Sequence, residues 1–313
     1  MVYRRELNIQ EISVEEFAKV VAMEVATKLG NGFDVKTDVI IKRNDNELHS
    51  VAVCREDTNM APSFYVDETY RYCVFNDTIN ADDIVSDFAS RIAECALEIF
   101  RTGKNIPDAD KVISALTLDK DSLSVMLLDM KLNRAYLRDH PYKEVAAGLA
   151  MVICMNLDCE HGVTINNRLV EKYNKEALFQ AALENMEKNH PAELHPLYEV
   201  IKFGNMKNAL CSNEPIREPH VLTVEGTNMG ASGAAAIVYE GIAEKIAELY
   251  GGSFWMLPSS LYEWIIIPDE DGAYPEGYKT MVGEINESIV DPKDVLSFDV
   301  FYYDKNEKTI KRV

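Results

Sequence analysis

The sequence predicts an α+β protein with mixed sheets and several amphipathic helices. Long stretches carry apolar residues at helical spacing, and most of these stretches end at glycine or proline. Short apolar runs separated by turn residues lie between them and are typical of strands. Because the two patterns interleave along the chain, we expect helices and strands to share one or more cores.

The first elements are a helix and a hairpin. Ser13 is a good N-cap and Glu16 completes a capping box, so we expect a helix over residues 14–29, stopped by Gly30. The following run, "FDVKTDVIIKRNDNELHSVAVCRE", has strand-forming residues on both sides of a polar turn at residues 44–46. This pattern predicts two antiparallel strands.

The middle of the chain alternates between the two patterns. A second amphipathic helix is expected over residues 81–102, before Gly103. "SLSVMLLDMKLN" predicts a strand, bulged near Leu127, and "AAGLAMVICMNLD" and "GVTIN" predict two more. Asn174 is expected to cap a helix that runs to residue 189, and a short helix follows over residues 197–203.

The C-terminal third predicts a β-turn-α-β unit, followed by a helix and a terminal hairpin. "HVLTVEG" is the first strand, and "TNMGASG" is a turn of small residues that leads into a helix over residues 234–250. "SFWML" and "LYEWIIIP" are strands separated by Pro258-Ser259-Ser260, which we expect to form the turn between them. This order favours some parallel pairing. A helix over residues 278–289 and the hairpin "FDVFYYDKNEKTIKRV" complete the chain.

Length and charge limit the classes of function. With 313 residues, of which 47% are hydrophobic, the chain suffices for an N-terminal lobe over residues 1–118 and a larger C-terminal lobe over 119–313, or for one continuous domain. No apolar run approaches the roughly 20 residues that span a bilayer, and no signal peptide is apparent, so we expect a cytoplasmic protein without membrane contact. The formal net charge of −20 argues against direct binding to nucleic acid.

The acidic charge has two interpretations. Carboxylates can keep a cytoplasmic protein soluble, or they can imitate nucleic acid and inhibit an enzyme that acts on it. Acidic residues are spread along the chain and form no single block. This distribution favours solubility.

Cysteine and histidine spacing predicts neither disulfides nor a metal site. The six cysteines include no Cys-x-x-Cys pair, and we expect reduced thiols. "HPAELH" brings His190, Glu193 and His195 close together, but Pro191 and Pro196 would interrupt a helix that aligned them as ligands. "CEH", residues 159–161, has too few donors. We therefore expect no metal and no cofactor.

Two clusters of polar residues are candidates for a binding surface. Asn228, Gly230 and Ser232 precede a helix, where backbone N–H groups could hold an anion. This turn lacks the spacing of a phosphate loop, and tight packing is the favoured interpretation. The second cluster is Pro258-Ser259-Ser260.

That second cluster raises the question of a serine nucleophile. Ser259 and Ser260 have no flanking glycines of a nucleophile elbow, although Glu263 and a distant histidine could join them in space. Five histidines are available for that role, namely His140, His161, His190, His195 and His220. We favour hydroxyls that satisfy backbone groups over a nucleophile, and the catalytic residues, if there are any, stay unknown.

The C-terminal stretch resembles a known signature. "VLTVEGTNMGASGAAAIVYEGIAEKIAELYGGSFWMLPSSLYEWIIIPDEDG", with its small-residue turn and "LPSS", is similar to the signature of an uncharacterised protein family from gut Firmicutes. That family is in turn distantly similar to the YtpQ-like family. Further similarity extends upstream through "NRAYLRDHPYKEVAAGLAMVICMNL" and "EALFQAALENM". The resemblance implies neither an activity nor catalytic residues.

The sequence leaves three hypotheses. The favoured one is a non-catalytic protein that binds another protein or a small ligand. The second is a serine-dependent hydrolase built around Ser259, Ser260 and Glu263, and the third is an acidic inhibitor that imitates nucleic acid. A histidine Nε2 within hydrogen-bond reach of either serine would favour the enzyme.

Overall fold

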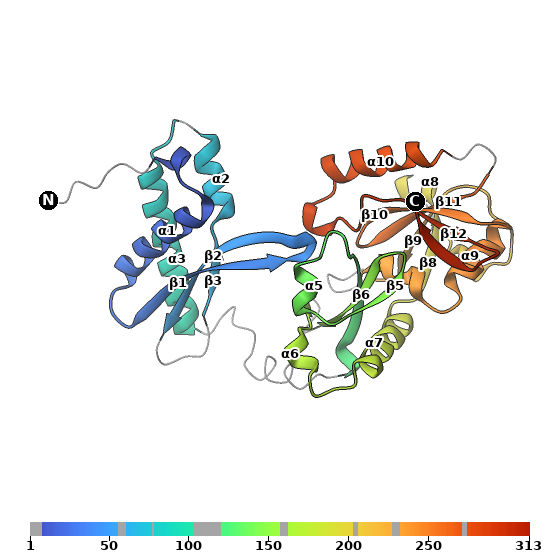
Figure 1. Ribbon diagram of the computed structural model, residues 1–313, viewed down its shortest axis with the longest axis horizontal. Coiled ribbons are helices and arrows are strands. Elements are labelled where there is room, and N and C mark those ends of the chain that lie inside the picture. Colours follow the sequence, from blue (N-terminus) through green and yellow to red (C-terminus); the bar gives the residue numbers. More distant parts are fainter. Residues whose placement is uncertain are drawn as a thin grey trace. The chain divides into compact units, whose positions relative to one another are not determined.

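The computed structural model (Figure 1) describes residues 8–55, 61–76, 78–102, 120–156, 162–202, 206–226, 232–270 and 274–313. The chain divides into two compact units. The smaller unit comprises Met1–Lys42 and Asn46–Ala109, and the larger comprises Arg43–Asp45 and Asp110–Val313. Each unit has a hydrophobic core, and each is described by itself below.

The smaller unit is a three-stranded sheet covered by helices. Its elements are a 3-10 helix η1 (Ile9–Glu11), α1 (Val14–Leu29), β1 (Phe33–Lys42), β2 (Asn46–Arg55), β3 (Ser63–Tyr65), α2 (Asp67–Phe75) and α3 (Ala81–Thr102). The strands are antiparallel in the order β1-β2-β3. Helix α1 packs against β1 and β2, and α3 packs on α1 (Figure 1).

Local signals account for the boundaries in this unit. The predicted capping box is present, with Ser13 Oγ accepting from the backbone N–H of Glu16 and the Glu16 carboxylate accepting from that of Ser13. Gly30 ends the helix at a φ of 72°. The predicted hairpin is confirmed, because β1 and β2 pair in continuous register from Phe33 with Arg55 to Lys42 with Asn46.

The larger unit begins with a four-stranded sheet and three helices. After the 3-10 turns η2 (Arg43–Asp45) and η3 (Lys120–Ser122), its first elements are β4 (Leu123–Asp129), α5 (Tyr136–Asp139), β5 (Tyr142–Ala146), β6 (Leu149–Asn156), β7 (Gly162–Thr164), α6 (Asn167–Val170) and α7 (Lys175–Asn189). Strands β4 and β5 flank β6, which also pairs with β7. Helix α7 packs against β4 and β6.

A six-stranded sheet forms the rest of this unit. Its elements are β8 (Ala192–Pro196), α8 (Leu197–Lys202), η4 (Ala209–Cys211), β9 (His220–Val224), η5 (Gly233–Val238), α9 (Ile242–Tyr250), β10 (Phe254–Ser260), β11 (Glu263–Pro268), α10 (Pro275–Ser288), η6 (Pro292–Asp294), β12 (Phe301–Asp304) and β13 (Thr309–Arg312). The strand order is β13-β12-β10-β11-β9-β8. Helix α10 lies on β10, and α8 lies on β8 and β9 (Figure 1).

The predicted α+β class is confirmed, but the mixed sheets are not. Every strand pairing in the described residues is antiparallel. Strands β9 and β10, which begin and end the expected β-turn-α-β unit, do not pair with each other, because β11 lies between them. The chain order alone suggested their direct pairing, whereas the hairpin of β10 with β11 displaces one strand from the other.

The connection between β9 and β10 also differs from the expected single helix over residues 234–250. It consists of the 3-10 helix η5 and the α-helix α9, separated at Gly241, whose φ is 75°. Glycine adopts this left-handed conformation without steric cost, so the chain can change direction there. Of the apolar residues in α9, Ile246 is fully buried and Ile242 only partly.

A buried ion cluster joins β4 to the C-terminal hairpin. The Arg312 guanidinium donates to both Asp129 carboxylate oxygens, at 2.8 and 3.0 Å, and to Asp299 at 2.7 Å. Lys131 also donates to Asp299, and Ser297 donates to Asp129 at 2.6 Å. Burial raises the pKa of Asp299, but the hydrogen bonds and charges of its two cationic neighbours outweigh that effect and lower it to about 2.

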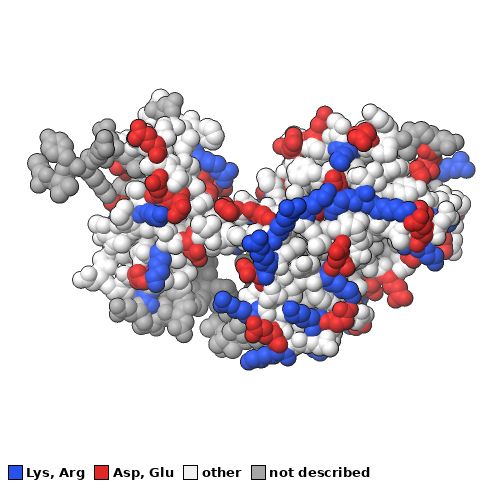
Figure 2. Space-filling view, in the orientation of Figure 1, with Lys and Arg blue, Asp and Glu red and all other residues white. Residues whose placement is uncertain are grey.

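No helix in the described parts of the chain is long and apolar enough to cross a membrane. Charges of both signs are interspersed over the face that Figure 2 displays. This arrangement resembles an ordinary solvated protein surface.

Candidate functional site

The candidate site is built on one face of the six-stranded sheet, where strand alternation collects polar side chains. Glu193 and His195 are two residues apart on β8 and therefore share a face. They lie opposite Thr223 and Val221 of β9, respectively. Val221 also pairs with Ile265 of β11, which places Glu263, two residues before Ile265, on this same face.

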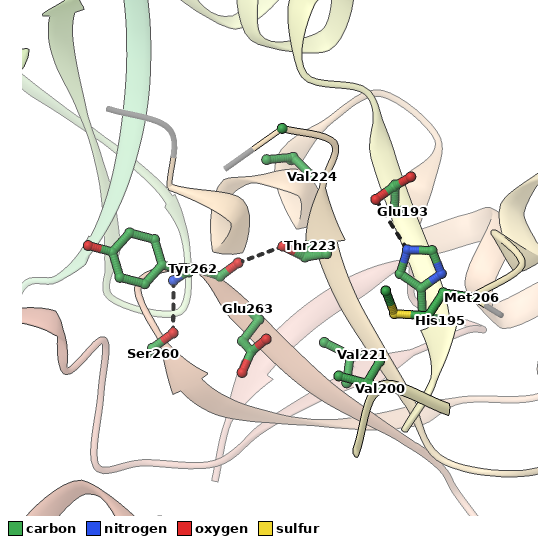
Figure 3. A pocket seen from close by; sticks show the side chains of 11 residues that line it. Glu193, His195, Val200, Met206, Val221, Thr223, Val224, Ser260, Tyr262 and Glu263 are labelled. Atoms are coloured by element: carbon green, nitrogen blue, oxygen red, sulfur yellow. Dashed lines mark hydrogen bonds and ion pairs between the residues drawn. The ribbon is translucent and has the colours of Figure 1, made fainter. Parts of the chain in front are cut away.

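Residues from these strands line a pocket of about 620 Å³, which we call the β8–β11 pocket. Its lining residues are Glu193, His195, Val200, Met206, Val221, Thr223, Val224, Gly226, Ser260, Tyr262 and Glu263. Figure 3 shows Glu193 and His195 on one side, Ser260 and Tyr262 on the other, and Glu263 between them. The pocket thus combines an apolar floor with polar groups at opposite sides.

Glu193 and His195 are joined by a hydrogen bond on one wall. The His195 ring is buried, and its Nε2 lies 3.1 Å from the Glu193 carboxylate. Its Nδ1 lies 3.4 Å from the backbone carbonyl of Lys207. Each ring nitrogen thus faces an oxygen atom of the protein.

The outer edge of β8 is covered by its own chain. The Asn208 side chain accepts from the backbone N–H of Leu194 and donates to the carbonyl of Ala192. These are the bonds that a neighbouring strand would make, so the side-chain amide takes its place at this edge. These two hydrogen bonds fix the outer edge of β8, the strand that carries Glu193 and His195.

At the end of the β10–β11 hairpin, a hydrogen bond joins Ser259 and Glu263. Ser259 Oγ donates to Glu263 Oε1 at 3.0 Å, and Ser260 Oγ accepts from the backbone N–H of Tyr262 at 3.0 Å. Both serines are the last residues of β10, so the predicted turn at Pro258-Ser259-Ser260 is wrong. The chain turns two residues later, at Leu261 and Tyr262, because Pro258 pairs with Trp264 within the ladder.

The turn at Leu261 and Tyr262 is clamped from beneath. Ser232 is buried and donates to the Leu261 carbonyl at 2.6 Å, while Thr223 Oγ1 donates to the Tyr262 carbonyl at 3.0 Å. A Cβ atom added to Gly233 would lie 1.9 Å from that same Tyr262 carbonyl. Only glycine allows this approach, so a glycine in the small-residue turn has a packing role.

The structure brings together four of the six residues predicted as a binding surface. Ser259, Ser260 and Glu263 lie at the mouth of the hairpin, and Ser232 lies under its turn. Ser260 and Glu263 line the β8–β11 pocket, whereas Ser259 and the buried Ser232 do not. Asn228 and Gly230 lie outside the described residues.

No described histidine reaches either serine. Each of the described rings has other partners, which are Asp67 for His49, the Tyr136 carbonyl for His140, the Glu225 carbonyl for His190, Glu193 for His195, and Glu218 with Tyr250 for His220. His161 lies outside the described residues. Ser259 Oγ donates to the Glu263 carboxylate. A catalytic triad would need a histidine between the serine and the carboxylate, and no described histidine lies there.

The electrostatics of the β8–β11 pocket favour a cation. Glu193 and Glu263 contribute carboxylates, and the lining residues of this described pocket include no lysine or arginine. Burial raises the pKa of the Tyr262 phenol, and the charge and hydrogen bond of Asp294 raise it further, so this hydroxyl stays neutral near pH 7. Among the described residues, no group of three or more His, Cys, Asp or Glu side chains could hold a metal ion.

Sequence reasoning missed the contributions of Glu193, His195 and Thr223. On a helix, Pro191 and Pro196 argue against Glu193 and His195 as aligned metal ligands. On a strand, an i, i+2 pair shares one face, and prolines at both ends are compatible with an edge strand. That period-2 pattern in "HPAELHP" was the available signal.

Comparison with known proteins identifies the family. Residues 14–305 match the model of a family of unknown function, DUF5688. The chain belongs to this family. No curated protein and no solved structure matches it. The expected resemblance to an uncharacterised family is thus confirmed at this level, and the distant similarity to the YtpQ-like family stays a prediction.

Proposed function

We propose that this member of the DUF5688 family is a non-catalytic binding protein whose β8–β11 pocket takes a small organic cation, such as an alkyl amine or guanidine. The observation that carries the proposal is the pair of carboxylates, Glu193 and Glu263, among the lining residues of a pocket that has no lining lysine or arginine. Its volume of about 620 Å³ lies within the range of roughly 300–1,000 Å³ common for small-molecule sites.

The lining residues offer both acceptors for a charged group and apolar surface for an alkyl chain. Glu263 lies between the two walls. A bound ammonium there donates hydrogen bonds to the Glu263 carboxylate and to nearby hydroxyl oxygens. Val200, Val221 and Met206 offer apolar surface for a short alkyl chain. Binding without conversion is the simpler role, because the hydroxyls of Ser259 and Ser260 are engaged in structural hydrogen bonds.

Titration calorimetry with 1,5-diaminopentane, a diamine with a short apolar spacer, tests the proposal. We expect saturable binding, while hexanoic acid, which carries the opposite charge on a similar chain, should not bind. If the diamine is present at about 100 times its Kd, the folded state should gain about 2.7 kcal/mol. Equal binding of both compounds, or binding of neither, would refute a cation site.

A matched pair of variants locates the site. Glu263→Gln removes the central carboxylate but keeps its shape, and we expect at least a tenfold weaker diamine affinity, equivalent to about 1.4 kcal/mol. Glu284→Gln removes the same charge from an exposed position of α10 and should leave the affinity unchanged. If both variants weaken binding equally, the effect comes from net charge and not from the pocket.

A further inference from the structure

The smaller unit carries a long strand whose outer edge has no partner strand in the described residues. Strand β1 is ten residues long and is the first strand of the order β1-β2-β3. An edge of this length presents a row of backbone donors and acceptors that can pair with another chain. The β1 edge is independent of the β8–β11 pocket, which belongs to the other unit.

Backbone hydrogen bonds establish which residues of β1 face outward. On the β3 side of β2, Val53 N–H donates to the Pro62 carbonyl and the His49 carbonyl accepts from Val66 N–H. Odd-numbered residues of β2 therefore direct their backbone N–H and C=O groups toward β3, and even-numbered residues direct theirs toward β1. Because Asp38 lies opposite Ser50, the even-numbered residues of β1 bond to β2, and the odd-numbered residues direct their N–H and C=O groups outward.

One outward group shows how the edge is satisfied in a single copy. The N–H of Val39 donates to the carboxylate of the preceding Asp38 at 2.9 Å. A side chain here takes the place of a neighbouring strand. Val39 and Ile41 are also 43% and 37% exposed, although both are β-branched apolar residues.

We propose that two copies of this chain associate through β1, antiparallel and in register about a twofold axis at Thr37. In this register Val35 lies opposite the second copy's Val39, and Phe33 lies opposite its Ile41. Lys36 lies opposite its Asp38, and the symmetry produces that ion pair twice. The two three-stranded sheets become one continuous six-stranded sheet, and the outward groups of Val35, Thr37 and Val39 form a ladder.

Charge selects this register from its neighbours. Moving the axis to Lys36 places that lysine opposite its own copy and Asp34 opposite Asp38, which sets like charges against each other. Moving the axis to Asp38 places two aspartates opposite each other at the centre of the interface, and pairs the opposite charges of Asp34 and Lys42 only at the ends of the strand. Cross-strand pairs of like charge are unfavourable, whereas the register centred on Thr37 pairs opposite charges on one face and apolar residues on the other.

The two charged pairs have favourable geometry. Asp34, Lys36 and Asp38 are exposed on the face away from α1. Even-numbered residues of both copies direct their backbone groups away from the new interface, so Lys36 and Asp38 form non-hydrogen-bonded pairs, in which side chains lie closest. Lys36 already contacts Asp34 at 2.7 Å, and the second copy's Asp38 would add a second carboxylate beside it.

Light scattering after size exclusion, with the full-length protein, tests the proposal. At about 100 µM and physiological ionic strength, where a micromolar Kd populates the complex, the wild type should have twice the 35.3 kDa mass of one chain. Lys36→Glu and Asp38→Lys should each run at the mass of one chain, because each places like charges opposite each other twice. Lys19→Glu, a charge reversal at an exposed position of α1, should keep the doubled mass.

Mixing the two single variants gives the decisive result. A Lys36→Glu chain and an Asp38→Lys chain are complementary at both pairs, so the mixture should regain the doubled mass that neither has alone. Thr37→Pro removes an outward N–H without removing a bond to β2 and should also run as one chain. A wild type of single mass, single variants that stay doubled, or a mixture that stays single would each overturn pairing through β1.

Discussion

Replacing Arg312 by methionine should destabilise the larger unit more than any other single loss of charge at the C-terminal hairpin. The Arg312 side chain is 14% exposed and the Asp129 side chain that it binds with two hydrogen bonds is 2% exposed. The guanidinium also donates to the backbone carbonyls of Ala147 and Gly148. Methionine keeps much of the length of the side chain and removes all of these donors.

The size of the stability loss follows from the Asp129 carboxylate, which loses its ion-pair partner. Without the guanidinium, the buried Asp129 carboxylate retains only Ser297 Oγ and the backbone N–H of Lys131 as donors. Breaking a buried ion pair by removing one partner costs about 3–5 kcal/mol, because the desolvated charge is left uncompensated. We therefore expect the free energy of unfolding in urea to fall by about that amount.

The neighbouring residue provides a matched control. Lys311 contacts Asp304 and Glu307, but its side chain is 43% exposed, so Lys311→Met should cost far less stability than Arg312→Met. Adding Asp129→Asn to Arg312→Met should recover part of the loss, because no unpaired charge then stays buried. A loss below about 1 kcal/mol for Arg312→Met, or no recovery in the double variant, would refute the reasoning.

Three further predictions concern pH, packing and thiol reactivity. The pKa of Asp299 is lowered from 3.8 to about 2, so its contribution to stability should be complete above pH 4 and be lost as the pH falls toward 2. Acid titration of the wild type against Asp299→Asn, followed by circular dichroism, measures this contribution. Ile246→Ala should cost about 2–5 kcal/mol in urea unfolding, and Ile242→Ala should cost less, because Ile242 is only partly buried. Burial raises the pKa of the Cys154 thiol to about 11, so iodoacetamide at pH 8 should modify the exposed Cys211 well before Cys154, as peptide mass spectrometry of the folded protein would record.

Elements with complete local signals could be predicted from the sequence. The α1 helix has a capping box at its start and a glycine at its end, and the β1–β2 hairpin has turn residues between two strand-forming runs. The helix capped by Asn174 was predicted for the same reason. In each case the stabilising contacts join residues only a few positions apart, so the pattern in the sequence contains them.

The sheet order and the candidate site depended on contacts that are distant in the chain. The β8–β11 pocket exists because β8 pairs with β9 and β9 pairs with β11, which brings Glu193 within the same pocket as Glu263. The sequence alone determined that the serines of "LPSS" adjoin two buried strands, but the tertiary structure decided that they end β10 and that the chain turns at Leu261 and Tyr262. Strand register depends on which side chains are buried against the rest of the fold. Here Trp264 is buried in the core and its Nε1–H donates to the Ala234 carbonyl. Such contacts join residues that are far apart in sequence, so the local pattern does not contain them.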